Sequence, residues 1–577
     1  MPGLEEHPQL LPNIIKDQTT GPAGIVAGEL AAEEHLISDQ QEASQSYGTI
    51  ELNQEECADY NGYALPPTQL RVVVLLLFLC SFLAALDTTV VTALLTKIAN
   101  DLNAISLISW IATAYLLSCS AMQPIFGKLS DIFGRRAMLF ICCITFGLGC
   151  AMCVTKSLTM LVLGRFVTGL GGLGMTCLGT ITMSDLIPLR DRGFYQGMAN
   201  IFFGLGSASG GFVGGLISDA LGWEYVFILQ VPLALLAAFV IRKYLILPSG
   251  SPGLGAVGSS MRAKLARVDF LGSFLLVLAL MCVLTAASIG GKDVAYSSPW
   301  FIGLCIASFV LLAAFVYVEA YISEEPIIPI HLLGERTIIS LSLANWFYSM
   351  GVFTYLFYIP VFFSTVMQLS GTQTGLRLIP NFFAVSVGSV GAGIYMKKTG
   401  RYWKLAMVFG LISVIGIIRL YWINPQASLL TQFTIMLPPG FGYSVMLTIT
   451  LLALILAAPA KYQACTTSIQ YTFRSTGSTL GVSIALALFQ YGLRKNLLWR
   501  VPAVVLDPEL AKKFIEKALA NSDYIYKAPK YVSQAISDSY WMACRLAFAF
   551  AVATITMGAI SAIFMRENKL HLTVNRD

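Results

Sequence analysis

One acidic residue, Asp87, interrupts the apolar stretch 72–95. A helix of about 24 residues crosses the roughly 30 Å hydrocarbon core of a bilayer, so this stretch is long enough to span a membrane. A carboxylate inside a span costs on the order of 2.5–3.5 kcal/mol on insertion scales and faces a cavity or a partner rather than lipid. Asp87 is therefore a candidate proton or cation site on a transport path; the alternative is a structural acid paired with a neighbouring helix.

The other titratable residues do not compete with Asp87 for a place near the middle of the protein. All four histidines lie outside the apolar segments, although histidine has the pKa best suited to carrying protons: His7, His35, His331 and His571. The remaining acids of these segments fall at segment ends: Asp131, Asp185, Asp219, Glu224 and Glu319. A carboxylate that exchanges a proton for a cationic substrate is the simplest coupling device that this sequence can build.

Two arginines in apolar segments are further candidates. Arg165, if buried, needs an acidic or carbonyl partner, and we expect it to sense the protonation of Asp87; the alternative is a structural arginine near the non-cytosolic end of its helix. Arg474 could meet a substrate carboxylate or, equally, pair with the turn after the twelfth apolar segment. Polar and aromatic candidates for a substrate cavity, each of which could instead bond helix to helix, are Gln123, Asn200, Gln230, Asn345, Tyr348, Asn381 and Gln470.

The composition indicates a polytopic membrane protein, because 56% of the residues are hydrophobic and 12% are charged. About fourteen apolar segments are long enough to span. They are 72–95, 106–126, 137–155, 158–183, 194–217, 223–246, 269–289, 300–322, 338–363, 376–396, 404–422, 430–457, 466–492 and 540–565. All cysteines but Cys57 lie within apolar segments, which indicates small apolar side chains, and we expect no metal or cofactor.

The basic residues predict the orientation. With a cytosolic N-terminus, most lysines and arginines between segments fall in cytosolic turns. The stretch 494–539 is a basic exception on the far side; long loops cross membranes largely regardless of charge, and a short amphipathic helix is expected near 507–521. Because the charges set topology, the net charge of +5 does not indicate a nucleic-acid partner.

A charged loop after the second segment recurs after the tenth. The first copy contains Gly127, Asp131, Gly134, Arg135 and Arg136, which can turn the chain sharply and lock helix ends with a charge cluster. The second copy, Gly393–Tyr402, has the same frame with Lys397 in place of the acid. Aligning the copies pairs segments 1–6 with 9–14 and leaves 7–8 as an insertion, and two related halves around a site are a transporter architecture.

These boundaries predict the domains. We expect a disordered cytosolic tail (1–68), a six-helix bundle (69–246), a cytosolic linker (247–268), an inserted helix pair (269–322), a second six-helix bundle (323–565) with the long non-cytosolic loop 494–539, and a cytosolic tail (566–577). In the first tail, Glu6, Leu10 and Leu11 resemble an acidic dileucine signal through which an adaptor complex could sort the protein.

The motifs resemble the major facilitator superfamily over about 70–565. The Gly127–Arg136 loop resembles motif A, and Leu86–Val91 resembles the first-helix motif of the fourteen-span drug:proton antiporter branch. Leu163–Gly172 resembles motif B, whose arginine is implicated in proton coupling. The antiporter motif C is matched by Gly206, Gly210, Gly211, Gly214 and Gly215, although Gly211 stands where proline is usual. The resemblance implies an all-α major facilitator fold with about fourteen transmembrane helices in a 6 + 2 + 6 arrangement.

Within the branch, Ser184–Asn200 and Ile228–Pro232 resemble the fungal vacuolar basic amino acid transporters of the Vba and Fnx group. That resemblance implies a vacuolar-membrane antiporter that moves basic amino acids into the lumen as protons leave. A plasma-membrane multidrug:proton antiporter fits the same motifs, and a transporter-like nutrient sensor is a third alternative. An ATP-driven pump is disfavoured, because no Gly-x-x-x-x-Gly-Lys-Ser/Thr phosphate loop occurs.

Overall fold

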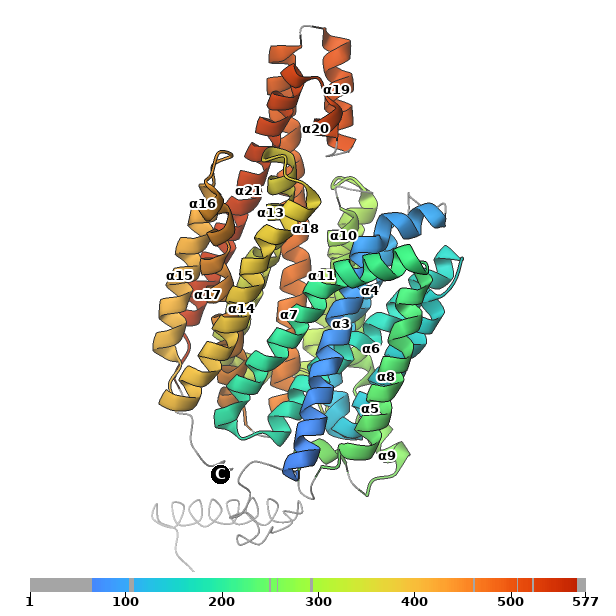
Figure 1. Ribbon diagram of the computed structural model, residues 1–577. Helices are drawn as coiled ribbons and strands as arrows, with labels where there is room; N and C mark the ends of the chain where they lie inside the picture. The colour runs from blue at the N-terminus through green and yellow to red at the C-terminus, as the bar shows by residue number, and fades with distance from the viewer. Residues whose placement is uncertain are drawn as a thin grey trace, which may run out of the picture. The chain divides into compact units, whose positions relative to one another are not determined.

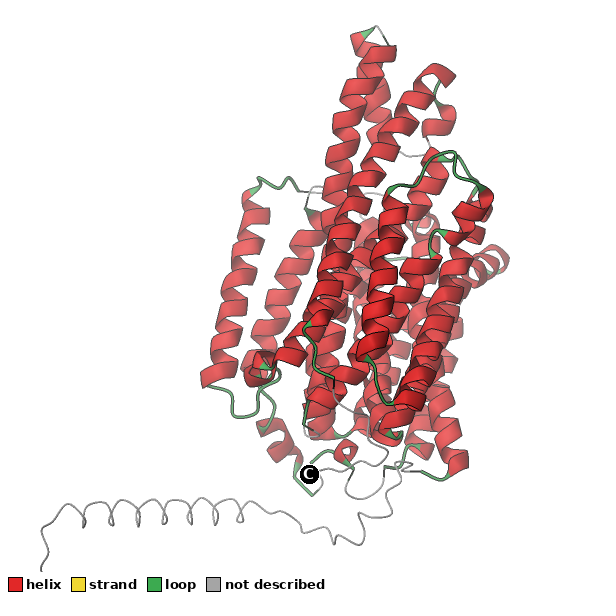
Figure 2. Ribbon diagram, turned by 90° about the vertical axis from the view of Figure 1, so that its left-hand side faces the viewer, coloured by secondary structure: helices red, strands yellow, loops and turns green. Residues whose placement is uncertain are grey.

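The computed structural model describes residues 65–102, 108–247, 251–256, 258–290, 294–459, 462–505, 507–520 and 524–567. In these ranges the chain forms helices joined by short turns and contains no strand (Figure 2). The predicted all-α class is therefore confirmed. The proposed sorting signal (Glu6, Leu10 and Leu11) and most of both expected tails lie outside the described residues.

The first six long helices pack around one hydrophobic core (Figure 1). They follow the expected apolar segments within a few residues at most ends: α3 (Pro67–Asp101), α4 (Ile108–Phe133), α5 (Arg135–Cys153), α6 (Leu158–Leu186), α7 (Leu189–Ala220) and α8 (Glu224–Tyr244). Small residues let some of these helices meet closely: a Cβ on Gly171 of α6 would stand 2.3 Å from the backbone nitrogen of Phe146 on α5.

The later helices build a second core. They are α13 (Arg336–Val361), which continues into the π-helix η3 (Phe362–Val366), α14 (Gly371–Thr399), α15 (Trp403–Tyr421), the short α16 (Leu429–Thr434), α17 (Leu437–Ala457), α18 (Gln463–Val504) and α21 (Lys530–Ile563). Aromatic side chains fill this core, among them Tyr348, Tyr358 and Phe362.

In the chain, the helix pair α10 (Phe270–Ile289) and α11 (Pro299–Tyr321) follows the first group of helices and precedes the second. Short elements flank it: η2 (Pro252–Leu254) and α9 (Met261–Ala266) before it, and α12 (Ile330–Gly334) after it. α10 packs against α11, α4 and α18, so it touches a helix from each group. The exact domain boundaries stay a prediction.

Twelve helices in the described residues are long and apolar enough to cross a membrane. The long helices that do not meet this criterion are α4 and α18, which carry more polar side chains, so the number of crossings stays a prediction. Both helices place polar side chains along a central cavity.

The stretch 494–539, expected to be a loop, is mostly helical. α18 continues to Val504, and it is followed by α19 (Pro508–Ala520), α20 (Tyr524–Lys527) and the start of α21. The expected amphipathic helix near 507–521 is α19. Buried Leu497, Phe514 and Ile536 extend the second core into this region, which keeps α18 helical beyond the end of its apolar run. We call residues 493–539 the stalk; α19 and α20 lie at the top in Figure 1.

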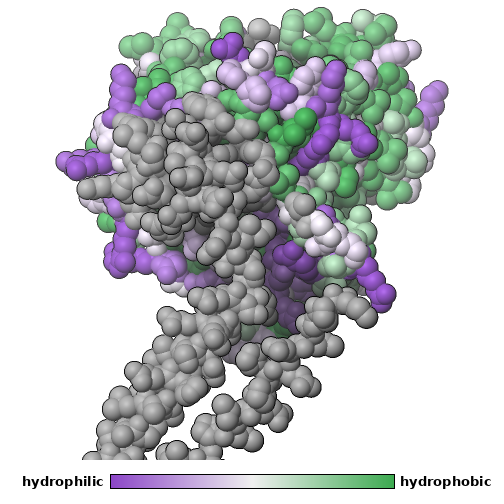
Figure 3. Space-filling view, turned by 90° about the horizontal axis from the view of Figure 1, so that it is seen from below, coloured by the Kyte–Doolittle hydropathy of each residue, from purple (hydrophilic) through white to green (hydrophobic). Residues whose placement is uncertain are grey.

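The opposite end of the helices carries the Gly127–Arg136 loop, and we call it the motif A end. Seen from below in Figure 3, polar side chains gather on this end where the surface is visible, while hydrophobic ones prevail toward the top and the upper right of the view. That distribution is expected of an end that meets water beside flanks that meet lipid.

Candidate functional site

The central feature of the site is an ion pair inside the first group of helices. Nη1 of Arg165 on α6 donates to Oδ2 of Asp87 on α3 at 2.7 Å, and the two side chains are 1% and 0% exposed. A buried charge needs a partner of this kind, because an unpaired one is strongly unfavourable. The two residues lie 78 positions apart in the chain.

Tyr115 of α4 separates this ion pair from the central cavity. Its ring centroid lies 4.4 Å from the guanidinium carbon of Arg165, and its hydroxyl donates to the carbonyl oxygen of Ala84 at 3.4 Å. Tyr115, Ala84 and Thr88 line the cavity, whereas Asp87 does not. The carboxylate therefore lies one layer behind the cavity wall. Its Oδ1 atom has no hydrogen-bond partner among the described residues.

The cavity has a volume of about 180 Å³ and lies between the two groups of helices. Helices α3, α4, α6 and α7 line one side of it, and α13 and α18 line the other. Pockets for drug-sized ligands have volumes of about 300–1,000 Å³, so this space suits a smaller molecule. Arg474 of α18 is the charged side chain among its lining residues, and its guanidinium carbon lies 6.0 Å from the ring centroid of Phe203 on α7.

The structure brings some of the candidate cavity residues together. Gln123, Asn200 and Arg474 line the cavity, and Gln470 lines a small adjoining pocket with Arg474. Asn200 is also committed to a contact across the two groups, because its Nδ2 donates to Oγ of Ser389 at 2.7 Å. No hydrogen bond or ion pair joins Arg474 to the turn after α17 among the described residues.

The other candidates occupy helix contacts away from the cavity. Asn345 donates to the carbonyl oxygen of Gln470 at 2.9 Å, and Gln230 donates to that of Val226 in its own helix at 3.2 Å. Tyr348 packs beside Gly558, and Asn381 lies within 3.5 Å of the Tyr355 hydroxyl. These four residues are polar groups of helix packing, the alternative that the sequence left open.

Sequence reasoning missed the hydroxyl side chains that line the cavity. On α18 they are Tyr471, Ser475, Ser478 and Thr479, and on α6 they are Thr176 and Thr180. Residues four apart lie on one face of a helix. The spacing of 471, 475 and 479 was the signal that could have found them, although α18 also carries hydroxyl residues on its other faces.

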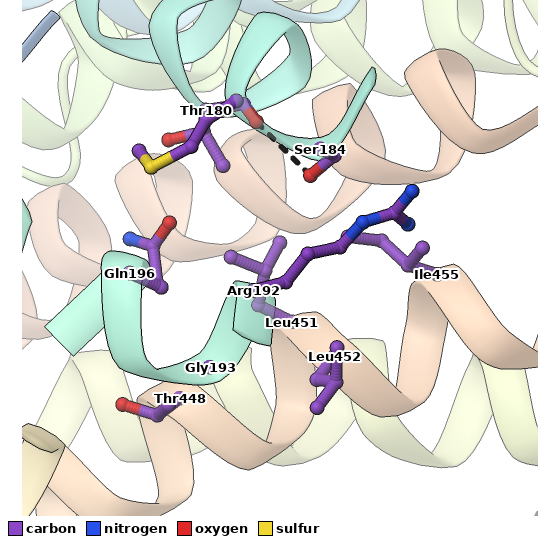
Figure 4. Close-up of a pocket in the computed structure, with 10 residues that line it drawn as sticks. Thr180, Ser184, Arg192, Gly193, Gln196, Thr448, Leu451, Leu452 and Ile455 are labelled. Carbon is purple, nitrogen blue, oxygen red and sulfur yellow. Dashed lines mark hydrogen bonds between the residues drawn. The ribbon is translucent and has the colours of Figure 1, made fainter. Parts of the chain in front are cut away.

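Toward the motif A end the cavity narrows. Thr180 and Gln196 line both the cavity and a second pocket of about 10 Å³, which Figure 4 shows with Arg192, Leu451 and Leu452 around it. That volume is about the space that one water molecule needs. The cavity is therefore nearly closed on this side.

Close contacts of glycine close the motif A end. A Cβ on Gly127 of α4 would stand 2.7 Å from the carbonyl oxygen of Ala464 on α18. On the other pair, α7 and α14, a Cβ on Gly197 would stand 2.8 Å from the Cα of Val390. Both pairs join a helix of the first group to a helix of the second.

The motif A residues form the predicted charge cluster. Arg135 is buried and bonds Asp131 at 2.7 Å and Asp185 at 2.9 Å. The second carboxylate oxygen of Asp131 lies 3.9 Å from Sγ of Cys465 in the first turn of α18, where the positive end of the helix dipole favours an anion. Gly134 has a φ of +92° that suits glycine, and Arg136 donates to the carbonyl oxygen of Arg242.

The second copy of the motif is chemically different. Lys397 of α14 pairs with Asp191 of α7 at 2.8 Å, so this bond crosses directly between the two groups. In the first copy, Lys128 pairs with Glu325 at 2.8 Å, and Glu325 also pairs with Arg267 at 2.7 Å. Glu325 thereby ties the flanks of the inserted helix pair to the motif A loop.

The five glycines of motif C divide into two faces. A Cβ on Gly206 would stand 2.4 Å from the carbonyl oxygen of Phe82. A Cβ on Gly210 would collide with the side chain of Thr89, and one on Gly214 would stand 3.0 Å from Cγ1 of Val90. These three positions let α7 meet α3. Gly211 and Gly215 have no atom within 4 Å of an added Cβ.

Residues 77–482 match the sequence pattern of the Major Facilitator Superfamily. The vacuolar membrane amino acid uptake transporter fnx2 of Schizosaccharomyces pombe is 33% identical over 85% of this chain and 83% of its own length. The multidrug resistance protein fnx1 of the same yeast is 33% identical, over 87% and 93%. The vacuolar basic amino acid transporter 2 of Saccharomyces cerevisiae is 31% identical, over 79% and 97%.

Solved structures are similar in fold. The proton:xylose symporter XylE aligns with a TM-score of 0.54 at 16% identity, over 87% of this chain and 97% of that one. The human organic anion transporter MFSD10 aligns with a TM-score of 0.53 at 15% identity, over 85% and 100%. At these identities the likeness shows the fold alone.

Proposed function

The chain belongs to the Major Facilitator Superfamily, and we propose that it exchanges protons for amino acids, basic ones included, moving them from the cytosol into the vacuole lumen. Its family and fold make it a multi-pass membrane transporter of small molecules rather than an enzyme. The observation that carries the proposal is the buried pair between Asp87 and Arg165, one layer behind the cavity wall.

We infer the coupling step from the charges of this pair. When Asp87 is ionised, it neutralises Arg165, and this pair adds no net charge that would repel a cationic substrate in the cavity. When a proton binds Asp87, Arg165 keeps its charge without a partner, behind the thin wall formed by Tyr115. A cation in the cavity is then repelled, so proton binding releases the substrate. The unpartnered Oδ1 of Asp87 is the atom that receives the proton.

The direction of transport is inferred from the closed motif A end, which we call the gate. The excess of lysine and arginine assigns the motif A end to the cytosol. The Lys397–Asp191 pair and the glycine contacts hold that end closed, and we infer that in this state the cavity exchanges with the lumen. A proton from an acidic lumen reaches Asp87 in this state, and the substrate leaves toward the lumen. Opening of the motif A end then delivers the proton to the cytosol.

The driving force is sufficient for accumulation. Each pH unit across the membrane supplies about 1.4 kcal/mol per proton, and a membrane potential adds about 2.3 kcal/mol per charge per 100 mV. The test uses sealed vacuolar vesicles that take up labelled lysine or arginine. Collapse of the pH gradient must abolish accumulation; uptake that survives it rejects proton coupling.

A plasma-membrane multidrug:proton antiporter is the second candidate, because a relative of equal identity is a multidrug resistance protein. The cavity of about 180 Å³ favours the smaller substrate. Localisation of the protein, together with the drug sensitivity of a deletion strain, separates the two candidates.

The vacuolar location rests on relatives named for the vacuole and on the proposed signal at Glu6, Leu10 and Leu11. Replacing both leucines with alanine must redirect the protein if an adaptor complex reads the signal. The nutrient-sensor alternative predicts that a chain with Asp87→Asn keeps signalling after transport is lost.

A further inference from the structure

We propose that the cavity is a zwitterion site: Arg474 and Ser475 bind the α-carboxylate of an amino acid, and the side-chain oxygen of Gln123 accepts from its ammonium group. This inference rests on the proposed function and names the part of the substrate that is recognised. It follows that the carboxylate, rather than the cationic side chain, is the feature that every substrate shares.

The groups that donate hydrogen bonds to the carboxylate, which we call the donor pole, are on α18. Arg474 points its charge at the cavity and stacks on Phe203 of the facing helix. No acidic residue lies within salt-bridge distance of it among the described residues. The hydroxyl oxygen of Ser475, the next lining residue, is buried without a hydrogen-bond partner there. A guanidinium and a hydroxyl left open in this way match a carboxylate, which accepts charge-assisted hydrogen bonds.

The acceptor pole is on α4. Gln123 is 1% exposed and lines the same cavity, and its Oε1 has no hydrogen-bond partner among the described residues. A buried acceptor without a partner is unfavourable, so a ligand N–H that reaches it is well placed to bind. Gln470 presents a second such oxygen in the adjoining pocket, since its Nε2 is committed to Thr450.

The two poles lie at adjacent levels. Gly127 of α4 meets Ala464 and Ser468 of α18. Gln123 lies one turn from Gly127 toward the stalk, which is near the level of Gln470, and Arg474 lies one turn further. The separation along the helices is therefore roughly one turn, about 5 Å, which suits the charged groups of one amino acid.

Among the described residues, none that lines the cavity carries a carboxylate. The lining residues carry one positive charge, on Arg474, and Asp87 is behind the wall. A diamine would therefore meet a cationic site without a counter-charge, whereas lysine brings its own carboxylate. Neutral amino acids satisfy the same two poles, so they should compete with lysine.

The test measures competition for labelled lysine uptake in vesicles that contain the full-length protein. Lysine and cadaverine differ only in the α-carboxylate, and glutamine keeps the carboxylate but lacks the cationic side chain. We expect cadaverine to inhibit at least about tenfold more weakly than lysine, and glutamine to inhibit within that range, because one charge-assisted contact is lost only in cadaverine.

Variants of Arg474 test whether α18 causes the discrimination between lysine and cadaverine. Arg474→Gln should raise KM for lysine about tenfold or more while its inhibition by cadaverine stays unchanged, and Arg474→Lys should recover part of the loss. Arg419→Gln, which alters an exposed arginine remote from the cavity lining, is the matched control, and thermal unfolding of each purified variant shows that it is folded.

Equal inhibition by lysine and cadaverine, or an unchanged KM in Arg474→Gln, overturns the zwitterion site and leaves the proposed function intact. Lysine uptake that ignores the pH gradient but still discriminates against cadaverine overturns proton coupling and supports the site. Absence of amino acid uptake by the wild type overturns both.

Discussion

Gly393 of α14 and Gly193 of α7 meet backbone to backbone at the motif A end: a Cβ on Gly393 would stand 2.4 Å from the carbonyl carbon of Gly193. Real Cβ atoms do not approach backbone this closely, so the closed gate requires glycine at position 393. The contact joins the two groups of helices, and it must separate when the gate opens.

Gly393→Ala should therefore exclude the closed gate and arrest the carrier facing the cytosol. Overpacking of this kind costs about 1–3 kcal/mol, which shifts the equilibrium by roughly 5- to 150-fold. Vesicle uptake should fall accordingly. Gly391→Ala is the matched control, since a Cβ two residues earlier on the same helix meets no atom within 4 Å. Equal uptake by the two variants would contradict the gate assignment.

Either charge of the Asp87–Arg165 ion pair should destabilise the first group of helices when the other is removed. Asp87→Ala leaves a buried guanidinium unpaired and should destabilise the protein by about 3–5 kcal/mol. The double variant Asp87→Ala with Arg165→Leu should recover most of the loss, since no charge remains. Thermal unfolding in detergent measures both. A double variant no more stable than the single one would show that the pair is not the cause.

Asp87→Asn keeps the shape of the side chain but cannot exchange a proton. A one-unit pH gradient supports about tenfold accumulation per proton, and this accumulation should disappear in the variant. Exchange of labelled for unlabelled lysine should weaken as well, because the neutral amide leaves Arg165 unpaired, as protonation of Asp87 does. Asp219→Asn, which alters an exposed acid paired with Lys97, should accumulate lysine normally. Accumulation by Asp87→Asn would move the proton site elsewhere.

The two faces of motif C should respond differently to a methyl group. Gly206→Ala places a Cβ against the Phe82 carbonyl and should destabilise the protein by about 1–3 kcal/mol. Gly211→Ala adds a Cβ in open space and should be neutral or slightly stabilising, because alanine favours helices by up to about 1 kcal/mol over glycine. Unfolding temperatures show which variant is less stable. A less stable Gly211→Ala would contradict the packing of α7 on α3.

Glu325 should make the motif A end sensitive to acid. Partial burial pushes the pKa of Glu325 up, but hydrogen bonds from Arg267 and Lys128 outweigh it and hold the pKa below the ordinary value of 4.5. A depressed pKa contributes stability above the ordinary value, and this stability is lost as the pH falls through the folded-state pKa.

The wild type should therefore be more stable than Glu325→Gln near neutral pH and lose that advantage below about pH 4.5. Unfolding temperatures across this range measure the difference. Glu324→Gln, at the exposed neighbouring position, should show no such pH dependence. A constant difference between the wild type and Glu325→Gln would mean that the carboxylate charge is not responsible.

The helices were predictable wherever apolar runs were long, but two features were not. The apolar run of α18 stops near Arg494, so the sequence predicted a loop, whereas contacts with α19 and α21 keep the helix intact to Val504. Asp87 and Arg165 were each predicted to matter as charges inside spans. Their direct contact depends on how α3 packs beside α6, which no local pattern encodes.

The cavity residues show the same limit. Gln123 and Gln230 are both glutamines in apolar helices, yet one lines the cavity and the other bonds its own helix. Only the arrangement of helices distinguishes them. The hydroxyls of Ser475 and Thr479 were accessible to prediction through their spacing, because polar residues four apart mark one helix face.

The length of α18 has a practical consequence. Its 42 residues extend about 63 Å, twice the thickness of a bilayer's hydrocarbon core. α18 and α21 run unbroken from the second group of helices into the stalk. The direction of the stalk therefore reports the orientation of that group. The angle of the stalk to the detergent micelle gives single-particle imaging a landmark for aligning particles, and a fluorophore pair between the stalk and the first group would report each turnover as a change in distance.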